Sequence, residues 1–287
     1  MPVLDLPDGR GVGYETHGPR DGRVIVAPHG TPGCRYGHRP SDAAIERLNI
    51  LVVTYDRPGY GDSDPDPGRT VADGVHDVAA IADALGVEKF AVYGFSGGAP
   101  YALACAAMLG HRVVRAAALA GPAPSDAAGL DWTDGMDAEN AGVVEPDWEA
   151  VRAEMAADRD ALLADPEVAV AKLDARLPAP DVEALADPTL RRHVIAELLE
   201  ALRPGVLGWA DDAVALSKPW GFDPSEISVP VYLWYGVEDV LVPLAHGRWL
   251  AGRIPNRTFV EAPGKAHFAA VAMQDSVVDW LTADGWS

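Results

Sequence analysis

The chain has 287 residues, of which 48% are hydrophobic and 23% are charged, so it is long enough for one large domain with an insertion or for two modest domains. Its formal net charge of −20 at pH 7 argues against a nucleic-acid partner and against an anionic membrane surface, because phosphate binding depends on clustered Lys and Arg side chains. No segment approaches the roughly eighteen uninterrupted apolar residues of a membrane span.

Strand and helix patterns alternate through residues 1–121. The run at Ile50–Tyr55 is typical of a strand that is buried on both faces, and Val75, Val78 and Ile81 have the spacing of an amphipathic helix. The predicted elements are strands at 12–16, 24–27, 50–55, 90–93 and 114–119 and helices at 72–85 and 99–109. This alternation predicts an α/β fold with a mostly parallel sheet and helices on both of its faces.

The pattern changes between residues 122 and 227, where helical stretches are separated by prolines and no convincing strand is found. The predicted elements of this second half are helices at 148–157, 160–173, 190–202, 244–254 and 268–281 and strands at 229–235 and 258–260. We therefore expect a sheet domain made of residues 1–121 and 228–287, with a helical insertion at 122–227.

The segment Gly94–Gly98 has the pattern G-x-S-x-G between a predicted strand and a predicted helix. This is the setting of a nucleophile elbow, in which a serine on a sharp turn presents its hydroxyl above the sheet. Side chains two residues before and two residues after the serine would collide, and Gly94 and Gly98 avoid that collision. We interpret Ser96 as a candidate nucleophile, and a glycine-rich turn that happens to contain serine is the alternative.

A serine nucleophile needs a base, and the base needs a carboxylate to orient it. In an elbow of this kind the acid and the histidine follow the serine in that order, each beyond the carboxyl end of a later strand. Asp239 follows the strand predicted to end at residue 235, and His267 follows the last predicted strand. The sequence therefore predicts a triad of Ser96, Asp239 and His267, with Asp126 as the main rival for the acid.

The other histidines do not have this context, with the exception of His29. Those that lie in expected helices or surface turns are His17, His38, His76, His111, His193 and His246. The segment His29–Gly33 follows the strand at 24–27, which is where a second oxyanion donor is expected. We expect the backbone N–H groups of Thr31 and Gly97 to form the oxyanion hole, with His29 in a structural role.

These motifs together make the chain resemble α/β-hydrolase-fold proteins with a helical cap, over nearly its full length. The segments that carry the resemblance are His29–Gly33, Tyr55–Ser63, Gly94–Gly98, Asp239 with Gly236 and Pro243, and Gly264–His267. The chain is most similar to actinomycete-type members with a G-x-S-G-G elbow. The resemblance implies an eight-stranded, mostly parallel sheet and a cap that folds over Ser96. It also implies that Arg57 and Asp62 belong to the scaffold of the fold.

Departures from related subfamilies narrow the chemistry. Ser96 argues against the haloalkane dehalogenases and epoxide hydrolases, which use aspartate at this position. Gly97 stands where proline iminopeptidases usually carry tryptophan, which weakens a peptidase hypothesis. Lys265 stands where the family often has a small or acidic residue, and the sequence gives no account of its effect.

Aromatic and methionine side chains near these motifs predict a pocket for apolar or aromatic ligands. The residues expected to line it are Phe95, Tyr101, Trp132, Met136 and Phe268. The predicted function is that of a serine hydrolase that cleaves an ester or lactone of an apolar or aromatic small molecule through an acyl-enzyme.

Two alternatives to an ester or lactone hydrolase remain open. One is an aminopeptidase or amidase of the proline iminopeptidase type, in which Glu139 or Glu145 binds the substrate amine. The other is a non-hydrolytic ligand-binding protein or lyase on the same fold.

Motifs for metals, nucleotides and disulfides are not found. The sequence has neither H-E-x-x-H nor G-x-x-x-x-G-K-[ST], and Cys34 and Cys105 do not have C-x-x-C spacing. The first residues show no basic region followed by an apolar stretch. We therefore expect no cofactor and no metal, a small-molecule substrate as the partner, no nucleic-acid or membrane partner, a monomer or homodimer, and a cytoplasmic location.

Overall fold

Eight strands form one sheet in the described part of the computed structural model, which comprises residues 2–37, 39–142, 148–283 and 286. Their order across the sheet is β1-β2-β4-β3-β5-β6-β7-β8. β2 pairs antiparallel with β1 and with β4, and the other neighbours are parallel. The strands are β1 (Val3–Asp5), β2 (Gly11–His17), β3 (Arg23–Pro28), β4 (Ile50–Tyr55), β5 (Phe90–Phe95), β6 (Val113–Leu119), β7 (Val231–Gly236) and β8 (Arg257–Ala262). The predicted eight-stranded, mostly parallel sheet is confirmed.

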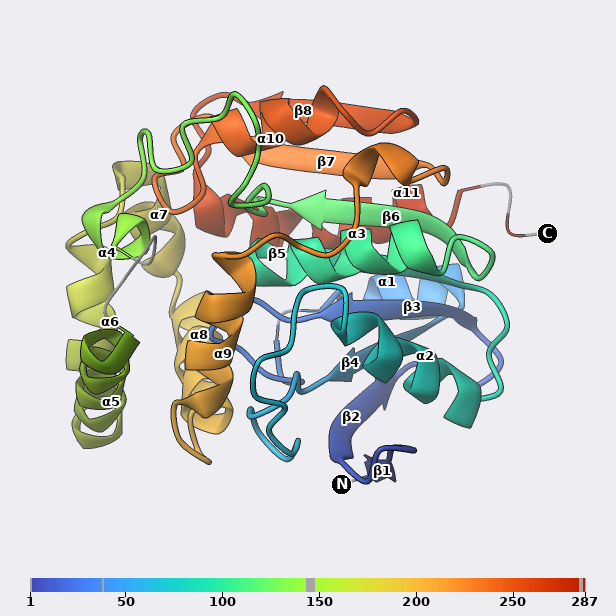
Figure 1. The fold of residues 1–287 in the computed structure, drawn as a ribbon, viewed down its shortest axis with the longest axis horizontal. Coiled ribbons are helices and arrows are strands. Elements are labelled where there is room, and N and C mark those ends of the chain that lie inside the picture. The colour runs from blue at the N-terminus through green and yellow to red at the C-terminus, as the bar shows by residue number, and fades with distance from the viewer. Residues whose placement is uncertain (1, 38, 143–147, 284–285, 287) are drawn as a thin grey trace.

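Hydrophobic side chains of the sheet alternate between its two faces. In β3, Val24 and Val26 belong to one buried cluster and Ile25 and Ala27 to the other, because successive side chains of a strand point to opposite faces. Each cluster is completed by helices that cover that face (Figure 1). The helices are α2 (Gly74–Ala84), α3 (Ala99–Met108) and α10 (Leu244–Ala251) on the first face and α1 (Asp42–Leu48) and α11 (Gln274–Leu281) on the second. The prediction of helices on both faces is also confirmed.

Residues 138–216, called the helical segment below, lie between β6 and β7 in the sequence. Figure 1 shows this segment at the end of the sheet toward which the arrow of β6 points, which is the carboxyl end of the parallel strands. Its helices are α4 (Ala138–Ala141), α5 (Trp148–Ala164), α6 (Pro166–Asp174), α7 (Ala179–Leu185), α8 (Pro188–Ala201) and α9 (Leu207–Leu216). The segment is therefore placed over the loops that carry the candidate site.

Prolines begin helices in this segment instead of only separating them. α6, α7 and α8 each have proline at one of their first two positions, where its missing N–H group costs nothing. The predicted bounds of a helix at 160–173 are wrong, because α5 continues to Ala164 and Asp165 starts a new helix by accepting the N–H of Val168 at 3.2 Å. α1, α4, α7 and α9 have no counterpart among the predicted helices.

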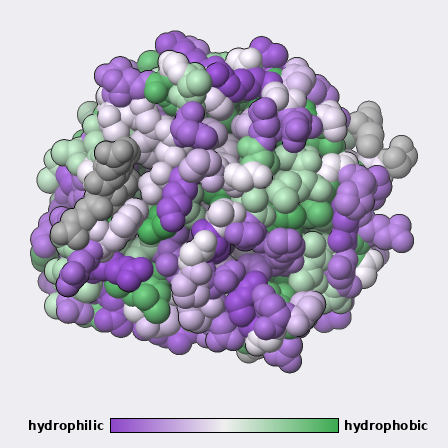
Figure 2. Space-filling view, viewed as in Figure 1, coloured by the Kyte–Doolittle hydropathy of each residue, from purple (hydrophilic) through white to green (hydrophobic). Residues whose placement is uncertain are grey.

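Hydrophilic residues are spread over the face seen in Figure 2, with smaller hydrophobic areas between them. This distribution agrees with the strongly negative net charge. Among the described helices, none combines the length and the apolar character needed to cross a membrane.

Candidate functional site

Ser96 occupies the turn between β5 and α3, at the start of the short helix η1 (Ser96–Gly98). Its φ angle is +52°, a left-handed conformation that residues other than glycine rarely adopt. A Cβ atom at Gly94 would collide with the carbonyl oxygen of Gly98, and one at Gly98 would collide with the carbonyl oxygen of His29. The packing around the turn therefore requires both glycines and leaves Ser96 as the side chain presented at its tip.

Asp239 and His267 come from the loops that follow β7 and β8. The imidazole Nδ1 lies 2.7 Å from Asp239 Oδ2, and both residues are buried. The other carboxylate oxygen accepts the backbone N–H groups of Leu241 at 2.8 Å and Val242 at 2.9 Å. Because the carboxylate is itself held by two donors, it fixes the ring orientation of His267 and keeps the proton on Nδ1.

The loop that carries Asp239 and the loop that carries His267 are joined through the backbone. The N–H group of Glu238 donates to the carbonyl oxygen of Lys265 at 2.9 Å. A Cβ atom at Gly236 would lie 2.5 Å from the same carbonyl oxygen, so glycine is needed for this approach. The side chain of Lys265 is exposed, and its contribution to the site is the carbonyl group.

The environment of His267 raises the pKa of its imidazole. Burial lowers the pKa of His267, but the charge of Asp239 and the hydrogen bond between them outweigh burial, so its pKa is raised above the ordinary value of 6.5. Asp181 and Asp137 act in the same direction. An imidazole of this kind is a stronger base than a free one, and the ion that it forms is stabilised.

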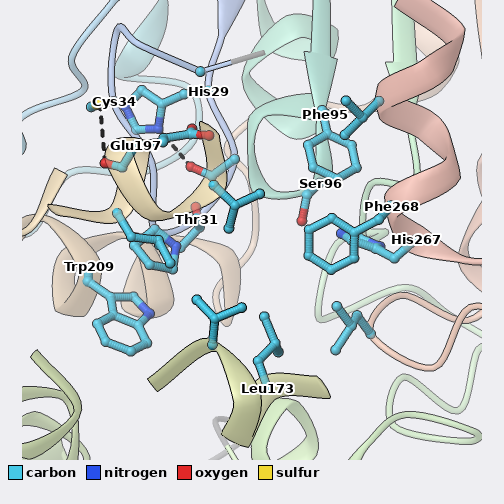
Figure 3. A pocket seen from close by; sticks show the side chains of 18 of the residues that line it. His29, Thr31, Cys34, Phe95, Ser96, Leu173, Glu197, Trp209, His267 and Phe268 are labelled. Carbon is cyan, nitrogen blue, oxygen red and sulfur yellow. Dashed lines mark hydrogen bonds between the residues drawn. The ribbon is translucent and has the colours of Figure 1, made fainter. Parts of the chain in front are cut away.

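Ser96 and His267 line the same cavity (Figure 3). The ring of Phe95 lies 4.8 Å from the imidazole between centroids and packs against it. The hydrogen bond of the imidazole in the described structure is to Asp239 and not to the Ser96 hydroxyl. A hydrogen bond between a serine nucleophile and its base is often long without substrate and shortens when substrate binds.

The other candidate acids and bases have different surroundings. Asp126, the rival acid, is exposed. His29 is buried and neutral, since its Nε2 accepts the backbone N–H of Arg57 at 3.0 Å and burial holds its pKa well below the usual value. His246 is also buried, with its pKa lowered by burial to about 4, and its Nδ1 accepts the backbone N–H of Ala123 at 3.0 Å.

Thr31 and Gly97 lie against each other beside Ser96. A Cβ atom at Gly97 would collide with Oγ1 of Thr31 and would lie 3.3 Å from its backbone nitrogen. All three residues line one cavity. The two backbone segments expected to bind an oxyanion are thus adjacent, and the absence of a side chain at Gly97 permits their approach.

A buried ion network, which the sequence patterns do not predict, holds the loop after β3 that contains Thr31 (the Thr31 loop). Asp212 of α9 is fully buried, and its Oδ2 accepts the hydroxyl of Thr31 at 2.8 Å. The same carboxylate forms ion pairs with Arg57 at 2.5 Å and with Arg69 at 2.7 Å. Its side-chain partners are Thr31, Arg57, Tyr60, Arg69 and Tyr101.

This network joins the helical segment to the loop after β3. Arg57 donates to the carbonyl oxygen of Gly30 at 2.8 Å and also to that of His29. Burial raises the pKa of Asp212, but the charges of Arg57 and Arg69 outweigh burial and hold its pKa far below the ordinary value. One signal in the sequence could have revealed this network. Asp211 and Asp212 stand in an otherwise apolar stretch, and the chain has arginines that need partners.

Two cavities meet at Ser96. The first, of about 350 Å³, extends between His267 and helices α5, α6 and α8 (Figure 3). The second, of about 450 Å³, extends between Gly97 and helices α4, α5 and α9. Thr31, Ser96 and Trp209 line both. Their apolar side chains include Leu162, Leu173, Val194 and Leu198 in the first cavity and Val151, Met155, Ala213 and Leu216 in the second.

Four of the five residues expected to line the pocket border these cavities. Phe95 and Phe268 line the first cavity, and Trp132 and Met136 line the second. The expectation for Tyr101 is wrong, because it borders neither cavity. Tyr101 is 1% exposed, and its hydroxyl donates to Asp212 at 3.0 Å. A buried acceptor that the sequence does not reveal thus determines its position.

The carboxylates suggested as amine ligands have different outcomes. Glu139 lines both cavities but is ion-paired with Arg176. Glu145 lies outside the described residues, as does His38. Within the described ranges, no group of three or more His, Cys, Asp and Glu side chains is arranged to hold a metal ion.

Comparison with protein families and curated proteins gave two matches. A family model described as alpha/beta hydrolase fold matches residues 23–271. A putative carbamate hydrolase, RutD, of Variovorax paradoxus (strain S110) is 33% identical over 78 residues, which are 26% of this chain and 29% of that protein. The chain therefore matches less than a third of the length of this curated relative.

Similar solved structures include an enol-lactonase from Burkholderia xenovorans LB400, with a TM-score of 0.71, 22% identity and coverage of 98% of this chain and 100% of that chain. A thermophilic esterase from Thermogutta terrifontis has a TM-score of 0.69 and 20% identity, with 98% of each chain covered. A hydrolase from Pseudomonas aeruginosa PA01 has a TM-score of 0.71 and 22% identity, again with 98% of each chain covered. At these identities the comparisons show a shared fold.

Proposed function

Because the chain belongs to the α/β-hydrolase fold family, we propose that it is a serine hydrolase with Ser96 as nucleophile, His267 as general base and Asp239 as the orienting carboxylate. The observation that carries this proposal is the 2.7 Å contact between His267 Nδ1 and Asp239 Oδ2, beside a cavity that Ser96 and His267 share. A serine in a turn has no base of its own, and this contact supplies an oriented one.

In the proposed reaction, Ser96 Oγ attacks the substrate carbonyl carbon while His267 Nε2 takes the hydroxyl proton. The imidazolium gives this proton to the leaving group, and an acyl-enzyme remains on Ser96. A water molecule then loses a proton to His267, attacks the acyl carbon and frees Ser96. Asp239 stabilises the imidazolium without taking up the proton itself. The backbone N–H groups of Thr31 and Gly97 stabilise the oxyanion of each tetrahedral intermediate.

The proposed substrate is an ester or lactone of an apolar or aromatic small molecule, and the helical segment acts as the cap that selects it. The two cavities that meet at Ser96 support this choice, since a carbonyl group there has apolar space on both sides. Trp132, Met136 and Trp209 supply aromatic and thioether surface for such groups. The names of the similar enol-lactonase and esterase agree with carbonyl-oxygen bond cleavage.

No specific observation favours the aminopeptidase or amidase alternative. Glu139, the described carboxylate suggested as an amine ligand, is already paired with Arg176. Asp158 also lines both cavities, so the substrate panel below decides between an ester and an amine substrate. The non-hydrolytic alternative requires that Ser96 has no nucleophilic role, which an experiment can decide directly.

Hydrolysis of a short p-nitrophenyl ester tests the proposal, with Ser96→Ala as the decisive variant and Ser225→Ala, at an exposed serine, as the matched control. Ser96→Ala is expected to lower kcat/KM by at least about a thousandfold, because its loss removes the covalent route. Labelling by a fluorophosphonate should be strong in the wild type and in Ser225→Ala and absent in Ser96→Ala. Undiminished turnover by Ser96→Ala would refute the assignment, and a wild-type Ser96 that never labels would favour the binding protein. A panel of esters, lactones and aminoacyl amides then separates the substrate classes.

A further inference from the structure

We propose that Asp181, on helix α7 of the helical segment, is a positioning residue that holds the base loop, residues 263–268, in the geometry required for catalysis. The inference rests on the proposed function of His267 as the general base. It adds a carboxylate from outside the sheet domain to the residues that control that base.

The carboxylate of Asp181 bridges two consecutive backbone N–H groups of the base loop. Its Oδ2 accepts the N–H of His267 at 3.1 Å, and its Oδ1 accepts the N–H of Phe268 at 2.7 Å. These N–H groups open the short helix η3 (His267–Met273), so they have no partner within that helix. Asp181 lies 86 residues before His267, and the contact therefore joins two separate parts of the fold.

No structural ion pair accounts for the burial of Asp181. The side chain is fully buried, and a carboxylate in such a position costs free energy unless hydrogen bonds compensate. In the described part of the chain no Lys or Arg side chain forms a salt bridge with it, and the charged groups that act on it most strongly are His267 and Asp239. The hydrogen-bond donors that compensate its burial belong to the base loop itself.

Two carboxylates thus bind His267, one at its imidazole and the other at its backbone N–H group. Asp239 holds the imidazole at Nδ1, at 2.7 Å, while Asp181 holds the backbone from which the ring projects. Phe268, the second residue held by Asp181, borders the first cavity next to the imidazole, with ring centroids 5.8 Å apart (Figure 3). A displacement of the base by about 1 Å can cost on the order of a hundredfold in rate, so control of the backbone has a large effect on catalysis.

The contact also makes the base depend on the helical segment. α7 packs against η3, and Asp181 is the residue of α7 that bonds to its first two N–H groups. The charge of Asp181 adds to that of Asp239 in stabilising the imidazolium. Removal of Asp181 is therefore expected to affect both the position of His267 and the pH at which it loses its proton.

The test compares Asp181→Ala and Asp181→Asn with Glu183→Gln, an exposed carboxylate on the same helix that serves as the matched control. The p-nitrophenyl ester is the substrate, and fluorophosphonate titration counts the active sites so that misfolded protein does not enter kcat. Asp181→Ala is expected to lower kcat about 10- to 100-fold with KM changed less than about threefold, because the substrate cavity is retained while the base is misplaced. Asp181→Asn keeps one acceptor oxygen, so its kcat is expected to lie between that of Asp181→Ala and that of the wild type. Glu183→Gln should match the wild type.

The pH profile separates positioning from a merely structural role. Loss of the Asp181 charge should move the acid limb of kcat/KM to lower pH in Asp181→Asn, and the downfield proton signal of the His267–Asp239 hydrogen bond should shift or broaden. Unchanged kcat per active site together with an unchanged acid limb in Asp181→Ala and Asp181→Asn would overturn the inference while leaving the proposed function intact. Full activity of Ser96→Ala would instead remove the proposed function and the inference with it.

Discussion

The helical segment reaches the proposed catalytic loops through two fully buried aspartates, and the two contacts have different chemistry. Asp212 on α9 holds the Thr31 loop and is neutralised by Arg57 and Arg69. Asp181 on α7 holds the base loop through two backbone N–H groups. Burial and residue type are the same, so the difference lies in the partners.

The partners determine how each carboxylate responds to burial. Burial raises the pKa of Asp181, and the backbone donors do not fully offset it. At Asp212 the charges of two arginines outweigh burial, and the pKa is lowered. We therefore expect Asp212 to contribute chiefly to stability and Asp181 chiefly to the geometry of the base.

The largest effect, a loss of unfolding free energy, is expected from Asp212→Ala. The substitution removes the carboxylate paired with Arg57, which is 1% exposed, and leaves Arg69, which is 4% exposed, with its longer contact to Asp211. Removal of one partner from a buried ion pair typically costs about 3–5 kcal/mol, so the free energy of unfolding in urea should fall by about this amount. Asp211→Asn is the control on the same helix, and its effect should be smaller because its contact with Arg69 is longer, at 3.6 Å. A loss in Asp212→Ala no greater than that in Asp211→Asn would remove the distinction between the two aspartates.

A smaller effect is expected from Thr31→Val, which deletes one hydroxyl of the network and leaves its ion pairs in place. The hydroxyl donates to Asp212 at 2.8 Å, and its loss should cost about 1 kcal/mol of unfolding free energy. Since the backbone N–H of residue 31 remains, kcat should fall by about tenfold or less. Urea unfolding and ester turnover measure the two effects. A loss of kcat clearly greater than about tenfold would show that the side chain of Thr31 has a direct role in catalysis.

The smallest effect concerns the pH profile. In the proposed mechanism the base is neutral His267, so wild-type kcat/KM should fall as the pH drops through a pKa raised above 6.5. Asp212→Asn should leave this midpoint in place, because the charge of Asp212 is balanced by arginines and the groups that raise the pKa of His267 are Asp239, Asp181 and Asp137. Profiles measured from about pH 5 to 9 at a temperature where the variant is folded provide the check. If the midpoint moves as far as it does in Asp181→Asn, the charge of Asp212 also acts on His267, and the distinction between the two aspartates is wrong.

Much of the sheet domain could be predicted from the sequence, because its signals are local. The apolar run Ile50–Tyr55 is a strand with the same bounds in the structure, and the glycines at 94 and 98 follow from sterics in a single turn. The loops that carry Asp239 and His267 could be located because each follows a recognisable strand. Local pattern and global fold agree in these regions.

The two aspartates could not be predicted, because their partners are distant in sequence. Asp181 lies in α7, whose first turn contains Pro180, and a proline there suggests a break when it in fact starts a helix. Asp212 lies in α9, and its partner Arg57 is 155 residues away. Pairing over such separations depends on how the helical segment packs on the sheet domain, which local periodicity does not describe.

The different partners of the two aspartates have a consequence for the proposed site. A displacement of α7 away from η3 separates Asp181 from His267 and Phe268. The ion pair of Asp212 with Arg57 and its hydrogen bond from Thr31 belong to α9 and do not involve α7. The helical segment is therefore attached at two points of different chemistry, through ion pairs at Asp212 and through backbone hydrogen bonds at Asp181. If His267 is the base, as proposed above, bond cleavage requires α7 to be seated on η3, because the Asp181 carboxylate binds the backbone of His267 in that arrangement.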